Sequence, residues 1–200
     1  MTKPRVRLVV MISGNGTNLQ SIIDATRLGT LPNADIVLVV SNRAKAFGLE
    51  RARLAGIPTN YLSLKPFMDN GRGRSGYDYA LAAAVERAAP DLIVCVGWMH
   101  ILSPVFLNRF PHKVVNLHPA LPGVLPGKDS LAGTFEAAAR GEPIVTGCMI
   151  HHVVPEVDAG AVIDTEPCPY RPGDTLDTFS ARMHAAERTV LIRALVTLVG

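Results

Sequence analysis

The sequence has no long hydrophobic run and little net charge, and each lack argues against a class of protein. No stretch of the 200 residues approaches the roughly 18 apolar residues that a membrane-spanning helix requires. The apolar run after Arg7, residues 8–12, is also far too short for a signal peptide. The formal charge of +3 is too small and too scattered to predict nucleic-acid binding. We therefore expect neither a membrane nor a nucleic acid as a partner.

Cysteine is scarce as well. The sequence holds three, Cys95, Cys148 and Cys168, which leave an odd one out and form no Cys-x-x-Cys pair. That usage favours buried thiols in a reducing compartment, so we expect a cytoplasmic protein. No metal-ligand spacing is present either, because His151 and His152 would point to opposite faces of a strand. We expect no metal.

The composition is that of an ordinary globular protein, with 48% hydrophobic and 18% charged residues. A chain of this length suits one domain and buries about 70% of its unfolded surface. Apolar runs alternate with helical patterns, which predicts an α/β fold: a single-domain, doubly wound, mostly parallel sheet with helices on both faces. The predicted strands are 7–12, 36–40, 91–96, 113–118, 144–154 and 161–165, and the predicted helices are one from Leu19 onward, 43–55, 77–89, 130–140 and 175–199.

A glycine loop follows the first predicted strand. It reads Ser-Gly-Asn-Gly-Thr-Asn over residues 13–18 and leads into a helical pattern, with Thr17 or Asn18 as the predicted N-cap. Unpaired main-chain N–H groups and the helix dipole converge at such a place, and glycine lets the backbone approach an anion closely. The loop is therefore a candidate phosphate site.

The loop does not have the pattern of a dinucleotide site. Leu19 stands where the third glycine of G-x-G-x-x-G belongs, and the Gly-Lys-Ser/Thr ending of a P-loop is missing. After the second strand, Ser41-Asn42-Arg43 supplies no acid to hold a ribose diol. A nicotinamide cofactor is disfavoured, and a single phosphate monoester fits better.

Two further segments are candidates for ligand contact. Residues 65–76 form a basic, glycine-rich stretch that reads as a solvated loop. The third predicted strand, 91–96, leads into Gly-Trp-Met-His-Ile-Leu-Ser-Pro at 97–104, whose apolar side chains could wall a flat aromatic ligand or belong to the core. The carboxyl ends of parallel strands are where open α/β sheets bind ligands.

The predicted strand 113–118 ends in Asn116 and His118, and Pro119 stops it. A spacing of two residues places both side chains on the same face of a strand. An amide can stabilise an oxyanion and an imidazole can transfer a proton near neutral pH, although such a pair can also simply close a strand. Asp158, beside Gly160, is either a turn former or an acid that acts with them.

The motifs, taken together, resemble a known family. The segments S-G-N-G-T-N-L-Q, G-W-M-H-I-L-S-P, V-N-L-H-P-A and H-H-V-V-P-E-V-D-A-G occur in that order and are similar to phosphoribosylglycinamide formyltransferases of purine synthesis. The similarity covers essentially the whole chain. It implies formyl transfer from 10-formyltetrahydrofolate to the amine of phosphoribosylglycinamide. It also implies one formyltransferase domain over residues 1–200, with a phosphate-binding N-terminal half and a folate-binding and catalytic C-terminal half.

The resemblance assigns roles to matching positions. Asn116, His118 and Asp158 match the catalytic triad, and His151 matches a histidine beside it. The ribonucleotide site is matched by Gly16, Thr17, Asn18 and Glu187. The folate site is matched by Arg74, Met99, His100, Ile101, Leu102 and Asn116.

Residue chemistry supports the triad assignment. Amine attack on a formamide develops charge on the formyl oxygen, to which Asn116 and protonated His118 can donate. Asp158 near His118 can raise the pKa of the imidazole and steer a water for proton transfer.

The sequence departs from the family's commoner pattern after His118. It reads P-A-L-P-G-V-L-P-G-K-D-S, which shifts a predicted surface lid at 120–128 and moves a basic residue to Lys128. Asp129 and Ser130 stand where relatives tend to carry a histidine, so no role passes to them.

Three other functions remain open. Two of them, formyltetrahydrofolate hydrolase and methionyl-tRNA formyltransferase, share the Asn-x-His pair and the distant Asp. The hydrolase usually has an additional N-terminal regulatory domain. The tRNA enzyme has an additional C-terminal nucleic-acid-binding domain. A non-catalytic module that binds a phosphate ligand is the third.

We expect a monomer or a homodimer.

Overall fold

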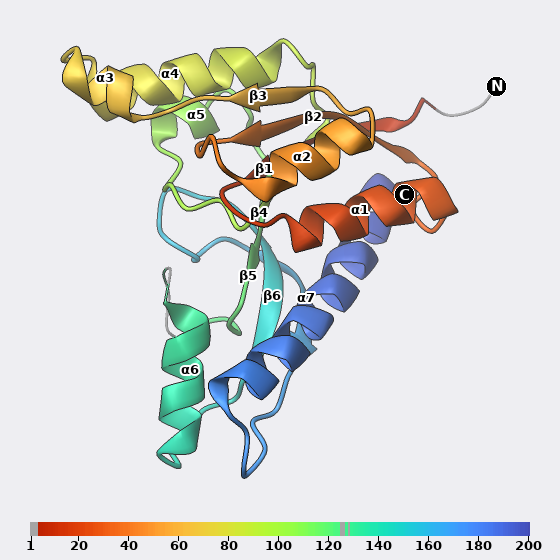
Figure 1. Cartoon of the computed structure of the whole chain (residues 1–200), viewed down its shortest axis with the longest axis vertical. Coiled ribbons are helices and arrows are strands. Elements are labelled where there is room, and N and C mark those ends of the chain that lie inside the picture. Colours follow the sequence, from red (N-terminus) through yellow and green to blue (C-terminus); the bar gives the residue numbers. More distant parts are fainter. Residues whose placement is uncertain (1–3, 125–126, 128) are drawn as a thin grey trace. The chain divides into compact units, whose positions relative to one another are not determined.

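The computed structural model describes residues 4–124, 127 and 129–200, and the helices and strands in it alternate along most of the chain (Figure 1). The predicted lid position Lys128 lies outside these residues. The strands are β1 (Val6–Ile12), β2 (Ala34–Ser41), β3 (Thr59–Tyr61), β4 (Leu92–Val96), β5 (Val114–His118), β6 (Gly147–His152) and β7 (Val162–Pro167). The helices are α1 (Thr17–Leu28), α2 (Phe47–Leu54), α3 (Lys65–Asp69), α4 (Gly73–Glu86), α5 (Pro104–Leu107), α6 (Ser130–Ala139) and α7 (Leu176–Val199).

The sheet has seven strands in the order β3-β2-β1-β4-β5-β6-β7. The pairs β1–β2, β1–β4 and β2–β3 are parallel, and β6–β7 is antiparallel. This confirms the predicted α/β class with a mostly parallel sheet. The chain divides into two compact units, unit 1 (residues 1–115 with 199–200) and unit 2 (residues 116–198).

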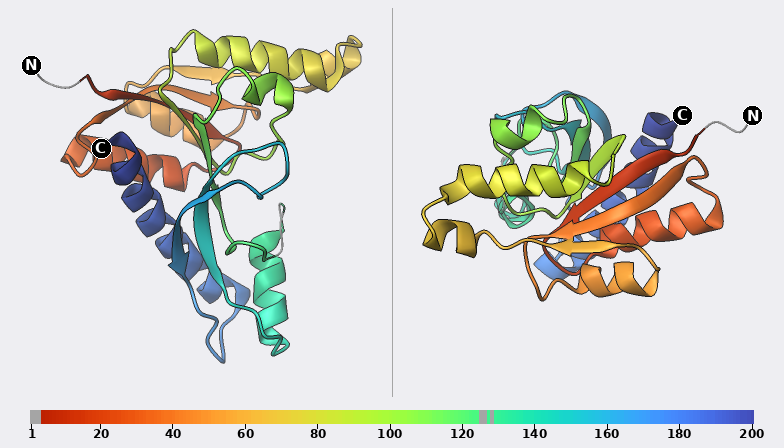
Figure 2. Two further views of the ribbon diagram at one scale, coloured as in Figure 1. Left: turned by 180° about the vertical axis from the view of Figure 1, so that it is seen from behind. Right: turned by 90° about the horizontal axis from the view of Figure 1, so that it is seen from above.

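Unit 1 is a doubly wound parallel arrangement. β1 and β4 read as near-continuous apolar runs because both faces of each strand are covered, and residues 8–12 of β1 are fully buried. Helices α1 and α2 lie on one face of the strands and α4 lies on the other (Figure 2). The strand order reverses between β1 and β4, the position in such sheets where a crevice opens at the carboxyl ends.

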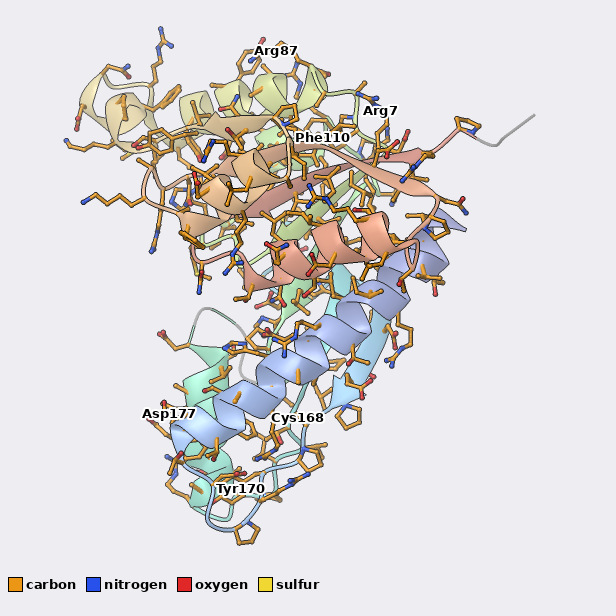
Figure 3. All side chains as sticks on the ribbon, turned by 45° about the vertical axis from the view of Figure 1, so that its right-hand side comes forward. Arg7, Arg87, Phe110, Cys168, Tyr170 and Asp177 are labelled. Atoms are coloured by element: carbon orange, nitrogen blue, oxygen red, sulfur yellow. The ribbon has the colours of Figure 1, made fainter. Side chains whose placement is uncertain are left out.

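Unit 2 packs its core around α7. Phe179 and Met183 of α7 are fully buried, and the ring of Phe135 from α6 lies 5.8 Å from that of Phe179. Tyr170 lies on the segment that joins β7 to α7 (Figure 3). Its ring meets that of Phe135 edge to face, with the ring centres 5.9 Å apart. These contacts fix α6 and the β7–α7 connection on the apolar stripe of the long helix.

Several predicted boundaries were wrong. The second helix begins at Phe47 and not at residue 43, because Ser41 Oγ accepts the N–H of Arg43 and Ala46 stays extended. Residues 65–76 are not a continuous loop: α3 occupies the start, supported by an ion pair of 2.7 Å between Lys65 and Asp69 one turn apart, and α4 begins at Gly73.

Other predicted boundaries shift by smaller amounts. The helix predicted at 77–89 ends at Glu86, the strand predicted at 144–154 is β6, and the one predicted at 161–165 is β7. The short strand β3 was not predicted. Neither Thr17 nor Asn18 precedes α1, since both are helical and Gly16 holds the cap position.

All three cysteines are free and buried, as the sequence indicated. Burial raises the pKa of Cys95 to about 12, which makes it an inert core thiol. Among the described helices, none combines the length and the apolar character needed to cross a membrane.

Candidate active site

Asn116 and His118 lie at the end of β5. Their spacing of two residues places both side chains on the same face of the strand. His118 is 4% exposed and Asn116 is partly exposed. The β-branched residues before them are buried, and Pro119 cannot continue the ladder of hydrogen bonds. The strand therefore delivers an amide and an imidazole to its own end, with the imidazole largely shielded from water.

Asp158 lies beside this pair, on the turn between β6 and β7. Its Oδ2 accepts the N–H of Gly127 at 2.9 Å and lies 3.5 Å from Nδ1 of His118. Its Oδ1 lies 3.5 Å from Nε2 of His151. Interaction with His151 lowers the pKa of Asp158, burial opposes it, and the Gly127 N–H and the nearby His118 lower it further. The carboxylate is thus held in its charged form.

The turn that carries Asp158 has a special backbone. Asp158 has φ of +53°, a left-handed conformation that Asp tolerates better than most residues. Gly160 follows at a close approach of two chain segments, since a Cβ there would collide with the main-chain carbonyl of His152. Both residues serve to bring the carboxylate against the end of β5.

His151 connects the amide to the carboxylate. Its Nδ1 lies 2.9 Å from the carbonyl oxygen of His152, which can only accept, so Nδ1 carries a proton. Nε2 lies 3.2 Å from Nδ2 of Asn116 and 3.5 Å from Oδ1 of Asp158. In the neutral ring it accepts one amide hydrogen of Asn116 and leaves the other to donate elsewhere, and in the protonated ring it donates to Asp158.

The glycine loop of unit 1 lies between β1 and α1. Gly16 is the residue before α1 and has φ of +73°, and a Cβ on it would lie 2.6 Å from Cα of Gly48. The N–H of Gly48, in the first turn of α2, donates to the carbonyl of Gly14 at 3.1 Å. Both glycines are therefore needed for the close contact between the loop and α2.

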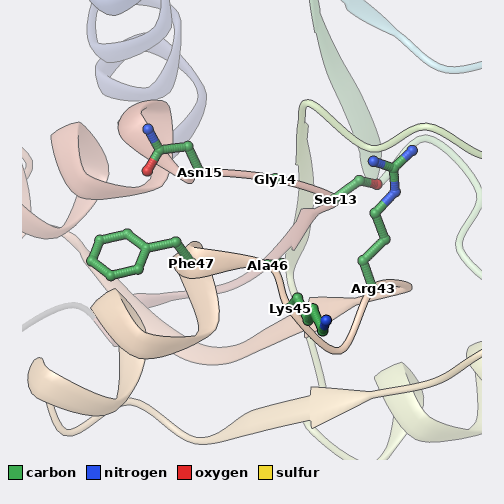
Figure 4. Close-up of a pocket in the computed structure, with 7 residues that line it drawn as sticks. All are labelled: Ser13, Gly14, Asn15, Arg43, Lys45, Ala46 and Phe47. Carbon is green, nitrogen blue, oxygen red and sulfur yellow. The ribbon is translucent and has the colours of Figure 1, made fainter.

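A shallow pocket of about 370 Å³ borders this loop (Figure 4). Its lining comes from the loop, from the β2–α2 connection and from the start of α2: Ser13, Gly14, Asn15, Arg43, Lys45, Ala46 and Phe47. The two cations on one side give it a positive character, which suits an anionic ligand.

The segment after β4 is divided between core and surface. Trp98 and Leu102 are buried at 9% and 4% exposure, whereas Met99 and Ile101 are 51% and 64% exposed. The apolar wall predicted from the sequence is therefore offered by Met99 and Ile101. His100 lies between them and contacts the ring of Trp98 at 5.7 Å.

Arg74 of α4 lies against the same segment. Its Nε donates to the buried Asp78 at 2.9 Å, and its Nη2 donates to the carbonyl of Ile101. Burial, with the nearby charge of Arg74, lowers the pKa of His100. The predicted folate residues Arg74 and 99–102 thus gather in unit 1, whereas Asn116 belongs to unit 2.

Glu187 lies on α7 and is 5% exposed. Its Oε2 is 3.0 Å from Nδ1 of His184, one turn earlier, and this contact raises the pKa of His184. In the described part of the chain, no group of three or more His, Cys, Asp or Glu side chains is arranged to hold a metal ion.

The fold and these motifs define a class of protein. The sequence profile of the formyl transferase family matches residues 6–195, and this chain belongs to that family.

Three of the similar relatives share one name. The phosphoribosylglycinamide formyltransferase of Schizosaccharomyces pombe is 44% identical over 195 residues, which is 94% of each chain. The Dictyostelium discoideum protein of the same name is 42% identical over 94% of this chain and 95% of its own. The crystal structure of glycinamide ribonucleotide transformylase 1 from Symbiobacterium toebii matches with a TM-score of 0.89 at 33% identity, over 98% of this chain and 88% of that one.

The sequence reasoning missed several residues around the glycine loop. Gly48 and Arg51 of α2 contact the loop, and Ser13 Oγ accepts the N–H of Met99. Each contact joins residues more than 30 positions apart, and neither periodicity nor a local motif marks such a pair. The one available signal was Gly48, a glycine inside the helix predicted at 43–55.

Proposed function

We propose that this protein transfers the formyl group of 10-formyltetrahydrofolate to the amine of phosphoribosylglycinamide. The observation that carries the proposal is the cluster of Asn116, His118 and Asp158 in unit 2, in a chain of the formyl transferase family. The names of the similar relatives support phosphoribosylglycinamide as the acceptor and the formyl group as the group transferred. Residues 1–200 act as a single formyltransferase domain, and the three buried thiols support a cytoplasmic location.

In the proposed reaction the glycinamide nitrogen attacks the formyl carbon, and negative charge develops on the formyl oxygen. Asn116 donates an amide hydrogen to that oxygen, and Nε2 of His151 accepts the other one when its ring is neutral. His118, when protonated, donates as well. Each donor aimed at a developing oxyanion contributes roughly 3 kcal/mol to the stability of the transition state.

The proton balance then requires one net transfer. The attacking nitrogen forms its bond to carbon and loses one proton, and N10 of the folate gains one as its bond to carbon breaks. Asp158 is held as a carboxylate and lies 3.5 Å from His118, so it stabilises the imidazolium that forms when His118 carries the proton. A water held by the carboxylate can complete the relay.

The ribonucleotide's phosphate binds the glycine loop in this proposal, through Gly16, Thr17 and Asn18 at the start of α1. Main-chain N–H groups and the helix dipole favour an anion there. Glu187 holds the ribonucleotide. The folate contacts Met99, His100, Ile101 and Leu102 on the segment beside Arg74, and Asn116.

Absorbance with 10-formyl-5,8-dideazafolate tests the proposal, with and without phosphoribosylglycinamide. Release of the deformylated product only when the ribonucleotide is present is the expected result. Release without the ribonucleotide would make this protein a hydrolase. No release in either case, with the ribonucleotide still bound in a direct binding assay, would leave a phosphate-ligand binding module.

A further inference from the structure

One side chain of α2 makes three contacts with the glycine loop and the helix that follows it. Arg51 Nε donates to the main-chain carbonyl of Asn15 at 2.8 Å, and Nη2 lies 3.2 Å from Asn15 Oδ1. The remaining nitrogen, Nη1, lies 3.3 Å from Oε1 of Gln20 in α1. The guanidinium also lies 5.0 Å from the ring centre of Phe47. These four contacts hold the guanidinium group of Arg51 in place.

These contacts determine which way the loop's peptide groups face. In a trans peptide the C=O and the following N–H point in opposite directions. Because Arg51 holds the carbonyl of Asn15, the N–H of Gly16 points to the opposite side of the loop. Gly48 acts in the same way one peptide earlier, since its N–H holds the carbonyl of Gly14.

The contact from Arg51 is also charged. A cation at the carbonyl end of a peptide polarises it and makes the N–H at the other end a stronger donor. A loop held in one geometry before the ligand arrives loses less conformational entropy on binding. Orientation, polarisation and rigidity all favour an anion on the side of the Gly16 N–H.

We propose that Arg51 is a positioning residue for the phosphate of the ribonucleotide. It acts through the Asn15–Gly16 peptide, without touching the phosphate. The proposal rests on the function proposed above, which places that phosphate at Gly16, Thr17 and Asn18. Nothing in the family resemblance assigns a role to this arginine.

The test compares Arg51→Ala and Arg51→Lys with Arg53→Ala. Arg53 is on the same helix but pairs with Glu50 at 2.6 Å on the surface, so its loss controls for removing a cation from α2. Arg51→Ala should raise the KM of the ribonucleotide at least about tenfold, as expected for losing charge-assisted hydrogen bonds, with the KM of the formylfolate changed less than about twofold. Arg51→Lys should recover part of the loss, because an ammonium reaches one acceptor but lacks the fork.

Equal KM values for the ribonucleotide in Arg51→Ala and Arg53→Ala would overturn the inference. So would a parallel rise of both substrates' KM values, because a role at the phosphate loop predicts a selective effect on the ribonucleotide. A second readout does not require turnover: inorganic phosphate is titrated into the wild type and the variants, and the amide NMR signals of Gly16 and Thr17 are followed. Phosphate should shift both signals in the wild type and in Arg53→Ala at lower concentration than in Arg51→Ala.

The two readouts separate this inference from the proposed function. If the wild type turns over no ribonucleotide but Arg51→Ala still weakens the phosphate-induced shifts, the proposed substrate is wrong and the positioning role of Arg51 stands. If the wild type turns over the ribonucleotide and Arg51→Ala leaves both KM and phosphate shifts unchanged, the positioning role is wrong and the function stands.

Discussion

The hydroxyl oxygen of Ser13 accepts a hydrogen bond of 2.9 Å from the main-chain N–H of Met99. Ser13 directly follows β1 and Met99 follows β4, so this bond spans the place where the strand order of unit 1 reverses. It joins the loop proposed for the ribonucleotide to the segment proposed for the formylfolate. Loss of the Ser13 hydroxyl is therefore expected to affect both the loop and the segment after β4.

Replacing Ser13 by alanine should raise the KM values of both substrates, by about two- to tenfold, because the partly buried N–H of Met99 loses its partner. Steady-state kinetics with each substrate varied in turn measures this effect. Ser63→Ala is the control, since the Ser63 hydroxyl accepts the N–H of Lys65 at an exposed site. A rise confined to one substrate would show that the bond does not link the two segments.

Gly16→Ala should weaken binding of the ribonucleotide more than tenfold while leaving the KM of the folate within about threefold. The new Cβ would lie 2.6 Å from Cα of Gly48, so the loop must move away from α2. Gly29→Ala is a matched control. Gly29 has a similar φ of +77° at the other end of α1, and a Cβ there would meet no described atom within 4 Å.

Both glycine variants carry the cost of a left-handed alanine, roughly 1–2 kcal/mol of unfolding free energy, so both should unfold at a lower temperature. The difference between them isolates the contact with Gly48. Equal ribonucleotide KM values in Gly16→Ala and Gly29→Ala would place the phosphate somewhere other than this loop.

His118→Ala and Asp158→Asn should each lower kcat by about 10²- to 10⁴-fold, the usual contribution of a positioned acid or base. Binding of the ribonucleotide should stay within about tenfold, because neither side chain belongs to the proposed phosphate site. Asp177→Asn, in the exposed first turn of α7, removes a carboxylate from the same unit and should leave kcat unchanged. Near-normal kcat in either triad variant would contradict the proposed mechanism.

The stability of the protein should depend on pH through Asp158. Its pKa in the folded state is below the ordinary 3.8, so the folded state favours the carboxylate form. The stabilisation that results is complete above the unfolded pKa and is lost as the pH falls through the folded pKa. The Asp158→Asn variant lacks this titrating carboxyl group. As the pH falls below about 4, its free energy of unfolding should therefore decrease less steeply than that of the wild type.

Urea unfolding of both proteins between about pH 3 and pH 7 measures the difference. The gap between the two unfolding free energies should be constant at the neutral end and shrink toward the acid end. A gap that stays constant to the acid limit would mean that His151, His118 and the Gly127 N–H do not favour the charged carboxylate.

Long apolar runs were the part of the fold most easily predicted. β1 and β4 are buried on both faces, so their apolar character is independent of register and the predicted bounds differ from the observed ones by one residue. The start of α2 was predicted four residues too early, because the Ser41–Arg43 turn depends on a hydroxyl and not on hydrophobic periodicity. In residues 65–76 the glycines suggested a loop, yet they only end α3 and begin α4.

The sequence singled out the residues of the proposed catalytic cluster but not the contacts that support them. The placement of Asn116 and His118 follows from strand alternation, whereas the role of Asp158 came from the family resemblance, because its place beside a turn glycine fits a plain turn former equally well. The contact of His151 with Asn116 joins two strands and could not be read from either one. The reach of Arg51 to Asn15 is likewise a tertiary contact, between the last turn of α2 and the loop before α1.

The left-handed backbone of Asp158 limits what chemistry that position can carry. Asp and Asn tolerate φ near +53° because their short side chains bond locally, whereas a glutamate has no such compensation. Glutamate would keep the negative charge but would have to move the turn, and with it the approach of Gly160 to His152. The choice between the two acidic amino acids is made here by backbone shape, and an engineer who wishes to lengthen this carboxylate must first redesign the turn.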